Sequence, residues 1–173
     1  TLLPYIKRSG IRKVMMISST SVYGKNTGIV SGETIPLPET PNAVALLKAE
    51  KLLSDEQAFK STIVRFGGLT GKERHPVKYL SGKKGLTDGD TPVNLIHLND
   101  CIGIITTILN KVAWGYTFNA VWPSHPPKRA YYREKAEEYG LEPPTFLAGG
   151  EDDKIITDGL VSTYLDYKYT TRP

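Results

Sequence analysis

The feature that most constrains the fold is the apolar run Val14-Met15-Met16-Ile17, which is followed at once by the hydroxyl run Ser18-Ser19-Thr20-Ser21. A run that is apolar at every position is typical of a strand buried on both faces, as strands are in a parallel sheet. Ligands of open α/β sheets bind at the carboxyl ends of the strands, where these hydroxyls stand. The run therefore predicts a core strand with a candidate site at its end. The same hydroxyl residues are equally typical of a capped turn.

A strand–helix–strand unit follows this run. Thr40-Pro41 predicts a helix start, because the Thr hydroxyl can cap a helix and Pro fits the first helical position. We expect this helix to run to about Gln57, and Thr62 to Phe66 to form the next strand. Two strands joined in this way form a right-handed parallel unit. Further strands are predicted at 93–98, 116–121 and 154–157, and further helices at 77–80, 127–139, 160–165 and after the cap Asn99-Asp100; this alternation indicates an α/β fold.

The composition argues against several classes of function. The chain has 173 residues, a formal charge of +4 and one cysteine, which excludes an intrachain disulfide. Lys and Arg are dispersed rather than gathered on one face, so we expect no nucleic-acid partner. No apolar run approaches the roughly 18 residues of a membrane span, and no signal peptide is visible. We therefore expect a cytoplasmic protein that does not bind membranes.

Few titratable residues stand out by themselves. The three histidines and Cys101 show no metal-ligand spacing, so we expect no metal site. Cys101 falls on the apolar face of its predicted helix and is interpreted as a core residue. Three carboxylates that could act as a general base are interpreted as isolated surface groups: Glu33, Glu39 and Glu50.

The start of the chain resembles the end of a helix. Lys7 and Arg8 stand where the last turn would be, Gly10 follows, and the first residue is Thr1 rather than Met. Basic residues in the last turn and a glycine just beyond it are helix-stop signals. A helix end that leads directly into a buried strand suggests that the chain enters in mid-fold. We expect a fragment of a longer protein.

The run from Ser18 to Gly24, the Glu and prolines after it, and a helix that carries Lys48 together resemble an extended short-chain dehydrogenase/reductase. That group is also called the NAD-dependent epimerase/dehydratase family, and the segment Arg74-His75-Pro76 most resembles its atypical YeeZ-like branch. The resemblance covers only the C-terminal half of the family, without its first strands and its Gly-rich loop. It implies an α/β fold: the C-terminal part of a Rossmann-like parallel sheet with a small α/β substrate lobe. Residues 1–71 would belong to the sheet domain and 72–173 mostly to the substrate lobe, with 91–121 returning in part to the sheet.

The resemblance also implies roles for single residues. Ser19 matches the Ser/Thr that hydrogen-bonds the reacting oxygen, and Lys48 matches the lysine that holds the nicotinamide ribose, although Lys48 is equally interpretable as a solvated helix residue. The catalytic tyrosine should stand one turn before Lys48, but that position is Val44, which has no proton to exchange. Tyr23 is the candidate replacement if it points into the same crevice. The other residues implied are Ser18, Phe66, Gly67, Gly68 and Leu69 for the cofactor, and Thr20, Arg74, His75 and Asn94 for the substrate.

The function that this resemblance implies is an NAD(P)-dependent oxidoreductase or epimerase of a sugar-like or nucleotide-linked substrate. The cofactor would be NAD or NADP, and tight binding would need the missing half, because the Gly-rich loop grips the pyrophosphate. The resemblance implies a small-molecule substrate as partner and is compatible with a homodimer. The alternative is a non-catalytic dinucleotide- or metabolite-binding protein of the same fold, which the valine at position 44 favours. A third reading is that these 173 residues alone have neither activity.

Overall fold

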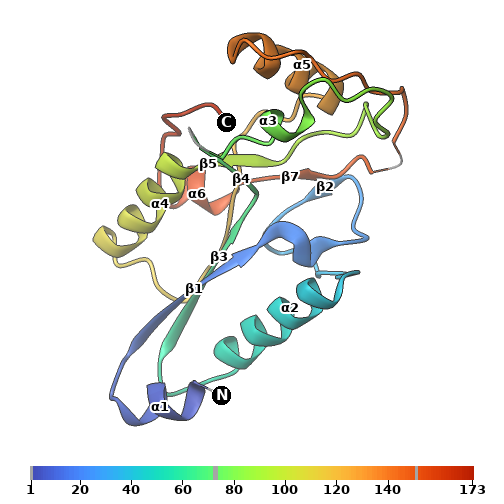
Figure 1. The fold of residues 1–173 in the computed structure, drawn as a ribbon. Helices are drawn as coiled ribbons and strands as arrows, with labels where there is room; N and C mark the ends of the chain where they lie inside the picture. Colours follow the sequence, from blue (N-terminus) through green and yellow to red (C-terminus); the bar gives the residue numbers. More distant parts are fainter. Residues whose placement is uncertain (1, 72–73, 151) are drawn as a thin grey trace.

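A computed structural model describes residues 2–71, 74–150 and 152–173. Its centre is a three-stranded parallel sheet in the order β1-β3-β6, formed by β1 (Lys13–Ser19), β3 (Lys60–Phe66) and β6 (Thr117–Ala120). Helix α2 (Pro41–Ser54) covers one face of this sheet and α4 (Leu98–Asn110) the other (Figure 1). The predicted α/β class with parallel strands is thereby confirmed.

The unit β1–α2–β3 forms for the reasons expected from the sequence. The Thr40 hydroxyl accepts a hydrogen bond from the Ala43 backbone N–H at 3.2 Å, and Pro41 is the first helical residue. The two strands then pair in parallel from Lys13 beside Lys60 to Ser19 beside Phe66. The helix ends at Ser54, three residues before the predicted end at Gln57.

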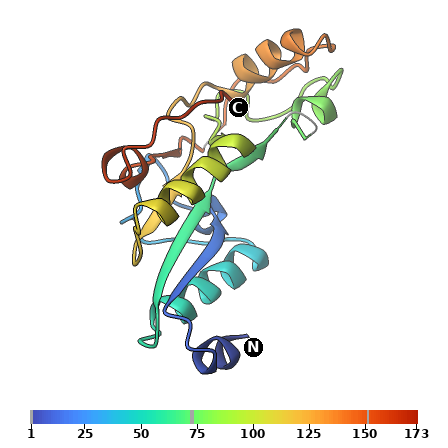
Figure 2. The ribbon, with the colours of Figure 1, turned by 90° about the vertical axis from the view of Figure 1, so that its left-hand side faces the viewer.

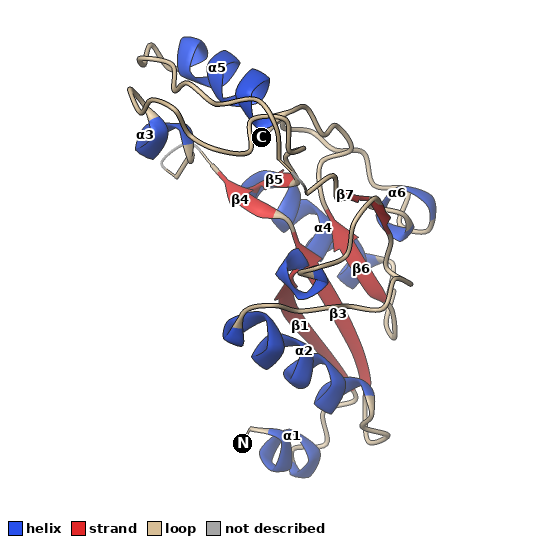
Figure 3. Cartoon of the chain, turned by 90° about the vertical axis from the view of Figure 1, so that its right-hand side faces the viewer, coloured by secondary structure: helices blue, strands red, loops and turns tan. Residues whose placement is uncertain are grey.

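Two short parallel pairs extend the structure beyond the main sheet. β4 (Gly68–Thr70) pairs with β5 (Leu95–His97), and β2 (Ile29–Val30) pairs with β7 (Ile155–Ile156). Figure 3 shows β4, β5 and β7 in red toward the upper end of the main sheet, with α3 (Val77–Leu80) and α5 (Lys128–Glu138) further out. Of the segment 91–121 that was expected to return to the sheet, β6 does so, whereas β5 pairs with β4. The remaining elements are α1 (Leu3–Arg8), the 3₁₀ helix η1 (Thr20–Tyr23) and α6 (Leu160–Thr163).

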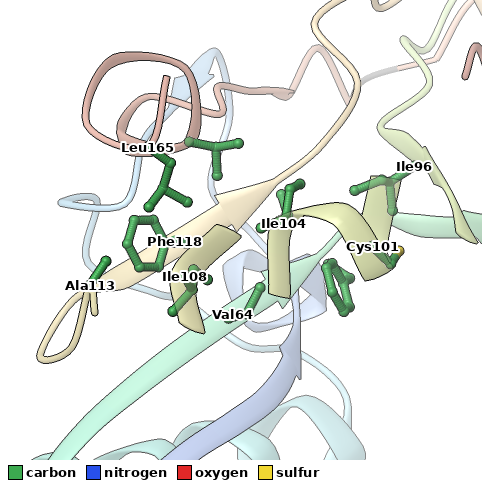
Figure 4. Close-up of a cluster of buried hydrophobic side chains, with 11 residues drawn as sticks. Val64, Ile96, Cys101, Ile104, Ile108, Ala113, Phe118 and Leu165 are labelled. Atoms are coloured by element: carbon green, nitrogen blue, oxygen red, sulfur yellow. The ribbon is translucent and has the colours of Figure 1, made fainter. Parts of the chain in front are cut away.

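The main core lies between the sheet and α4. Cys101, Ile104 and Ile108 of α4 pack there against Val64 and Phe118 of the sheet, as Figure 4 shows. Cys101 is 4% exposed, which confirms its predicted core position. The helix cap differs from the prediction, because the His97 ring Nδ1 accepts the Asn99 backbone N–H at 3.1 Å. Within the described ranges, no helix is long and apolar enough to cross a membrane.

Candidate functional site

The three strands of the main sheet end at the same level. Ser19 is paired with Phe66, and Phe66 with Ala120, so all three mark one carboxyl edge. Ser19 is half-buried and caps η1, since its Oγ accepts the Ser21 backbone N–H at 3.1 Å. A serine hydroxyl that accepts one hydrogen bond still has its own proton to donate. Both readings of the hydroxyl run, the capped turn and the candidate site, are therefore compatible with the position of Ser19.

Beneath this edge lies a buried ion pair that the sequence did not reveal. Glu50 is 3% exposed, so its interpretation as a surface carboxylate was wrong. Its Oε2 accepts from Arg65 Nη2 at 2.6 Å, and its Oε1 accepts from Arg65 Nε at 3.0 Å and from Ser18 Oγ at 2.5 Å. Burial alone would lower the pKa of Arg65, but the Glu50 carboxylate beside it raises that pKa overall. The signal in the sequence was an arginine between Val64 and Phe66 in a predicted strand, because a buried arginine needs a partner.

Tyr23 completes this network in the interior of the protein. Its side chain is fully buried, and its Oη accepts from Arg65 Nη1 at 2.7 Å. The same oxygen lies 2.9 Å from each of two acceptors, the Ser31 carbonyl oxygen and Asn119 Oδ1. The hydroxyl thus points into the core rather than into a crevice shared with Ser19. In this arrangement Tyr23 holds β3, β6 and η1 together, and its catalytic role stays a prediction without geometric support.

The burial of Glu50 fixes how α2 is rotated about its own axis. This rotation decides which way Lys48 points. Residues two apart on a helix lie about 200° apart around its axis, so Lys48 extends from the side turned away from the sheet, where it is exposed. Val44 is half-buried. The ribose contact predicted for Lys48 gains no support from this placement and stays a prediction.

The glycines after β3 allow a close approach of two backbone segments. A Cβ on Gly67 would stand 2.7 Å from the Asn94 carbonyl oxygen, to which the Gly68 N–H donates at 2.8 Å. Phe66 is a core residue and Leu69 is half exposed. Glycine is therefore required at position 67 because the Asn94 backbone of the same chain occupies the space where a side chain would stand.

The residues predicted to bind substrate do not converge on one point. Arg74 is exposed, and Thr20 is buried at the start of η1. The Asn94 amide is engaged at both ends, because Nδ2 donates to the Lys154 carbonyl oxygen and Oδ1 accepts the Ile156 N–H. His75 is 2% exposed: its Nδ1 accepts the Val77 N–H at 3.1 Å, and its Nε2 lies 2.9 Å from Tyr131 Oη. With Nδ1 as an acceptor, the ring is neutral and carries its proton on Nε2.

His75 should make the stability of the protein fall in acid. Burial, with Lys135 nearby, lowers its pKa from 6.5 to about 4. Between these values the unfolded chain binds a proton that the folded chain does not, so stability decreases as the pH falls from 6.5 to 4. At 1.36 kcal/mol per pKa unit, we expect a loss of up to about 3 kcal/mol. Urea denaturation of the chain and of His75→Asn across this range checks this; equal pH slopes for the two would contradict it.

A cavity of about 460 Å³ lies elsewhere, beside β6. It is lined by Tyr116, Asn119 and Asp158 among others, and by none of the residues predicted for the site. No group of three potential metal ligands occurs in the part of the chain that the structure describes. The cavity does not coincide with the predicted site, so the candidate site remains the carboxyl edge of the strands at Ser19.

Comparisons with known proteins place this arrangement in a family. A family model described as the NAD dependent epimerase/dehydratase family matches residues 1–120. Protein YeeZ of Escherichia coli K12 is 36% identical over 162 residues, which cover 92% of this chain and 58% of YeeZ. A UDP-glucuronic acid 4-epimerase from Bacillus cereus, solved with NAD, matches with a TM-score of 0.80 and 24% identity over 99% of this chain and 60% of its own. A functionally unknown conserved protein from Silicibacter pomeroyi matches with a TM-score of 0.83 and 18% identity, over 96% of this chain and 65% of its own.

The chain thus spans less than two-thirds of the length of each of these proteins. The structural matches support the Rossmann-like α/β fold, and the family model covers β1, α2 and β3 with the whole candidate edge. The resemblance inferred from the run Ser18 to Gly24 is therefore confirmed at the level of the family. The chain belongs to the NAD dependent epimerase/dehydratase family.

Proposed function

We propose that this chain is the Ser19-bearing part of an NAD(P)-dependent epimerase or oxidoreductase that acts on a nucleotide-linked sugar. The observation that carries the proposal is the position of Ser19. It lies at the carboxyl edge where β1, β3 and β6 all end, and its hydroxyl still has a proton to donate. Ligands of parallel sheets bind at this edge. The Bacillus cereus match is a UDP-glucuronic acid 4-epimerase, and this supports a substrate of that chemical class.

Ser19 would donate a hydrogen bond to the sugar oxygen at the carbon that reacts. Such a donor holds the substrate in a fixed orientation. It also stabilises the negative charge that develops on that oxygen during the reaction. The neighbouring Ser18 is held by Glu50, so the end of β1 is anchored and Ser19 needs little reordering on binding. NAD(P), when bound, would supply the redox chemistry.

The described residues fit only one end of such a cofactor. Gly67 and Gly68 lie against Asn94 and Leu95, so they form no open cradle for a pyrophosphate. The nicotinamide end and the substrate would lie at the strand edge beside Ser19, whose hydroxyl proton is left to donate. The pyrophosphate would be held by polypeptide outside these 173 residues.

The second candidate function is a binding protein of the same fold without catalysis. The observation that favours it is the absence of a poised acid or base near Ser19 among the described residues: Tyr23 is buried in an ion-pair network and Lys48 is exposed. Val44 cannot exchange a proton. Such a protein would bind NAD(P) or a nucleotide sugar without turning either over.

Calorimetry and kinetics separate the two functions. For the 173 residues alone we expect NAD to bind with a Kd above about 1 mM, since the pyrophosphate contacts are not present; micromolar binding would refute this.

In the intact protein we expect turnover of UDP-glucose or UDP-glucuronic acid, lowered by Ser19→Ala about 10²–10⁴-fold in kcat. The matched control is Ser21→Ala, an exposed hydroxyl two residues away. Cofactor binding without turnover in the unsubstituted protein would favour the second function.

A further inference from the structure

A second cavity, of about 410 Å³, lies beside helix α5. It is lined by Arg129, Ala130 and Arg133 of that helix and by the segment Pro144-Thr145-Phe146. Its volume is typical of a small-molecule site. Among the described residues that line it, two are arginines and none is a carboxylate, and no residue proposed for the Ser19 site is included. The cavity therefore has the charge that an anionic ligand needs, at a place that the proposed function does not use.

The two arginines are neighbours on one side of α5, because residues four apart stand one helical turn apart. Arg129 is held in place: its Nη2 forms an ion pair with Asp90 Oδ1 at 2.7 Å, and Asp90 Oδ2 accepts the Gly149 N–H at 2.6 Å. A guanidinium has five N–H donors, so most of those on Arg129 stay available. Arg133 is exposed, and among the described residues its side chain has no hydrogen-bond or ion-pair partner. The pair thus offers one fixed and one uncommitted guanidinium.

The other wall of the cavity supplies a hydroxyl group and an aromatic ring. Thr145 Oγ1 accepts the Gly85 N–H at 3.0 Å and has its own proton left to donate. The Thr145 backbone N–H donates to the Lys83 carbonyl oxygen at 2.9 Å. Phe146 stacks on Tyr132, with ring centroids 5.9 Å apart and planes inclined by 14°. These contacts fix the wall before any ligand binds, which lowers the entropy cost of binding.

We propose that this cavity binds a small organic phosphate, whose phosphate group accepts hydrogen bonds from Arg129, Arg133 and Thr145. Guanidinium groups bind phosphate oxygens in pairs. A tetrahedral phosphate presents oxygens in several directions, so it can accept from both walls at once, whereas a planar carboxylate is already satisfied by one guanidinium. The cavity holds several times the volume of a phosphate ion, which leaves space for an organic group against the Phe146 ring.

The experiment is a titration of the ¹⁵N-labelled protein with phenyl phosphate and with inorganic phosphate, at constant ionic strength because salt screens exposed charges. The NMR signals to follow are the Nε–H groups of the two arginines and the Thr145 amide. We expect saturable shifts with both compounds and tighter binding of phenyl phosphate, whose ring can contact Phe146. Arg133→Gln should raise the Kd at least about tenfold, the loss of one charge-assisted contact, as read from the Arg129 and Thr145 signals. Arg133→Lys, which keeps the charge without the planar fork, should lie between.

The matched control is Arg12→Gln, which removes the same charge from an exposed arginine between α1 and β1. Figure 2 shows α5, in orange, at the opposite end of the molecule from α1, in dark blue. The proposal is overturned if no saturable shift occurs, or if Arg12→Gln weakens binding as much as Arg133→Gln, since net charge alone would then explain it. Equal affinity for the two phosphates would assign the cavity to the free ion, and equal shifts with acetate would assign it to carboxylates. These signals are local to the cavity, so the result is independent of the proposed catalytic function.

Discussion

Replacing Glu50 with alanine is expected to lower the free energy of unfolding by about 3–5 kcal/mol, the range for breaking a buried ion pair. The substitution would leave the Arg65 guanidinium, 6% exposed, without its carboxylate. It would also leave Ser18 Oγ without its acceptor. A buried charge with no partner is far more costly than the loss of one hydrogen bond, because its desolvation is no longer offset. Urea denaturation followed by far-UV circular dichroism would measure the loss.

A double-mutant cycle separates the interaction energy of the Glu50–Arg65 pair from the contributions of its surroundings. Replacing Glu50 by leucine and Arg65 by methionine together should cost much less than either change alone, since no unpaired charge remains. The matched control is Glu142→Ala, which removes an ion pair with Lys84 whose two side chains are 64% and 60% exposed. Exposed pairs of this kind contribute little. If Glu50→Ala cost no more than Glu142→Ala, the buried network would not hold the sheet and α2 together.

The second large effect is expected at Asp100, which anchors the C-terminal segment. Its fully buried carboxylate accepts four hydrogen bonds, from Tyr167 Oη at 2.9 Å, the Thr170 N–H at 2.8 Å, Thr170 Oγ1 at 3.0 Å and the Thr171 N–H at 3.1 Å. Asp100→Ala would leave these donors without an acceptor. With roughly 1.5–3 kcal/mol for each bond to a charged group, and partial replacement by water, we expect a loss of about 3–5 kcal/mol.

Hydrogen exchange would show where this loss acts. In Asp100→Ala the amides of Thr170 and Thr171 should lose their protection, while those of β3 keep theirs. Asp100→Asn, which retains one acceptor oxygen, should lie between the two. Asp166→Asn is the control, because Asp166 pairs at the surface with Lys168, whose side chain is 83% exposed, and asparagine tolerates the positive φ of 46° at this position. Unchanged exchange at Thr170 and Thr171 in Asp100→Ala would show that the segment is held by its apolar contacts instead.

Much of the fold was predictable because its signals are local. The run Val14 to Ile17, the cap at Thr40-Pro41 and the apolar spacing of Cys101, Ile104 and Ile108 each depend on residues close in sequence. Apolar periodicity and capping act within one element, so the positions of these elements were predicted to within a few residues. The prediction that Val14 to Ile17 are buried on both faces was wrong, because Val14 to Met16 are half-buried and Ile17 is 48% exposed. Burial depends on which elements pack against the strand, and this is not set by the run itself. The resemblance carried by Ser18 to Gly24 rested on a local motif as well, and the family assignment confirmed it.

The candidate site was less predictable because its polar groups meet over long separations. Glu50 and Arg65 are 15 residues apart, and Tyr23 and Asn119 are 96 apart. Each of these side chains in isolation is typical of a surface or a turn. A histidine in a loop, such as His75, likewise gives no local sign that its ring will be buried against Tyr131. Only packing decides which polar groups are desolvated together.

By itself, the sequence determined that this chain builds a parallel α/β sheet with hydroxyl residues at one strand end. Those features follow from hydrophobic periodicity, turn chemistry and helix caps, which are set by neighbouring residues. The tertiary structure alone decided that Glu50 is buried, that Lys48 points away from the sheet, that Tyr23 faces the core and that β3 lies between β1 and β6. The phase of a helix and the order of strands are fixed by contacts between elements, and the free energy of those contacts belongs to the whole fold rather than to any one segment.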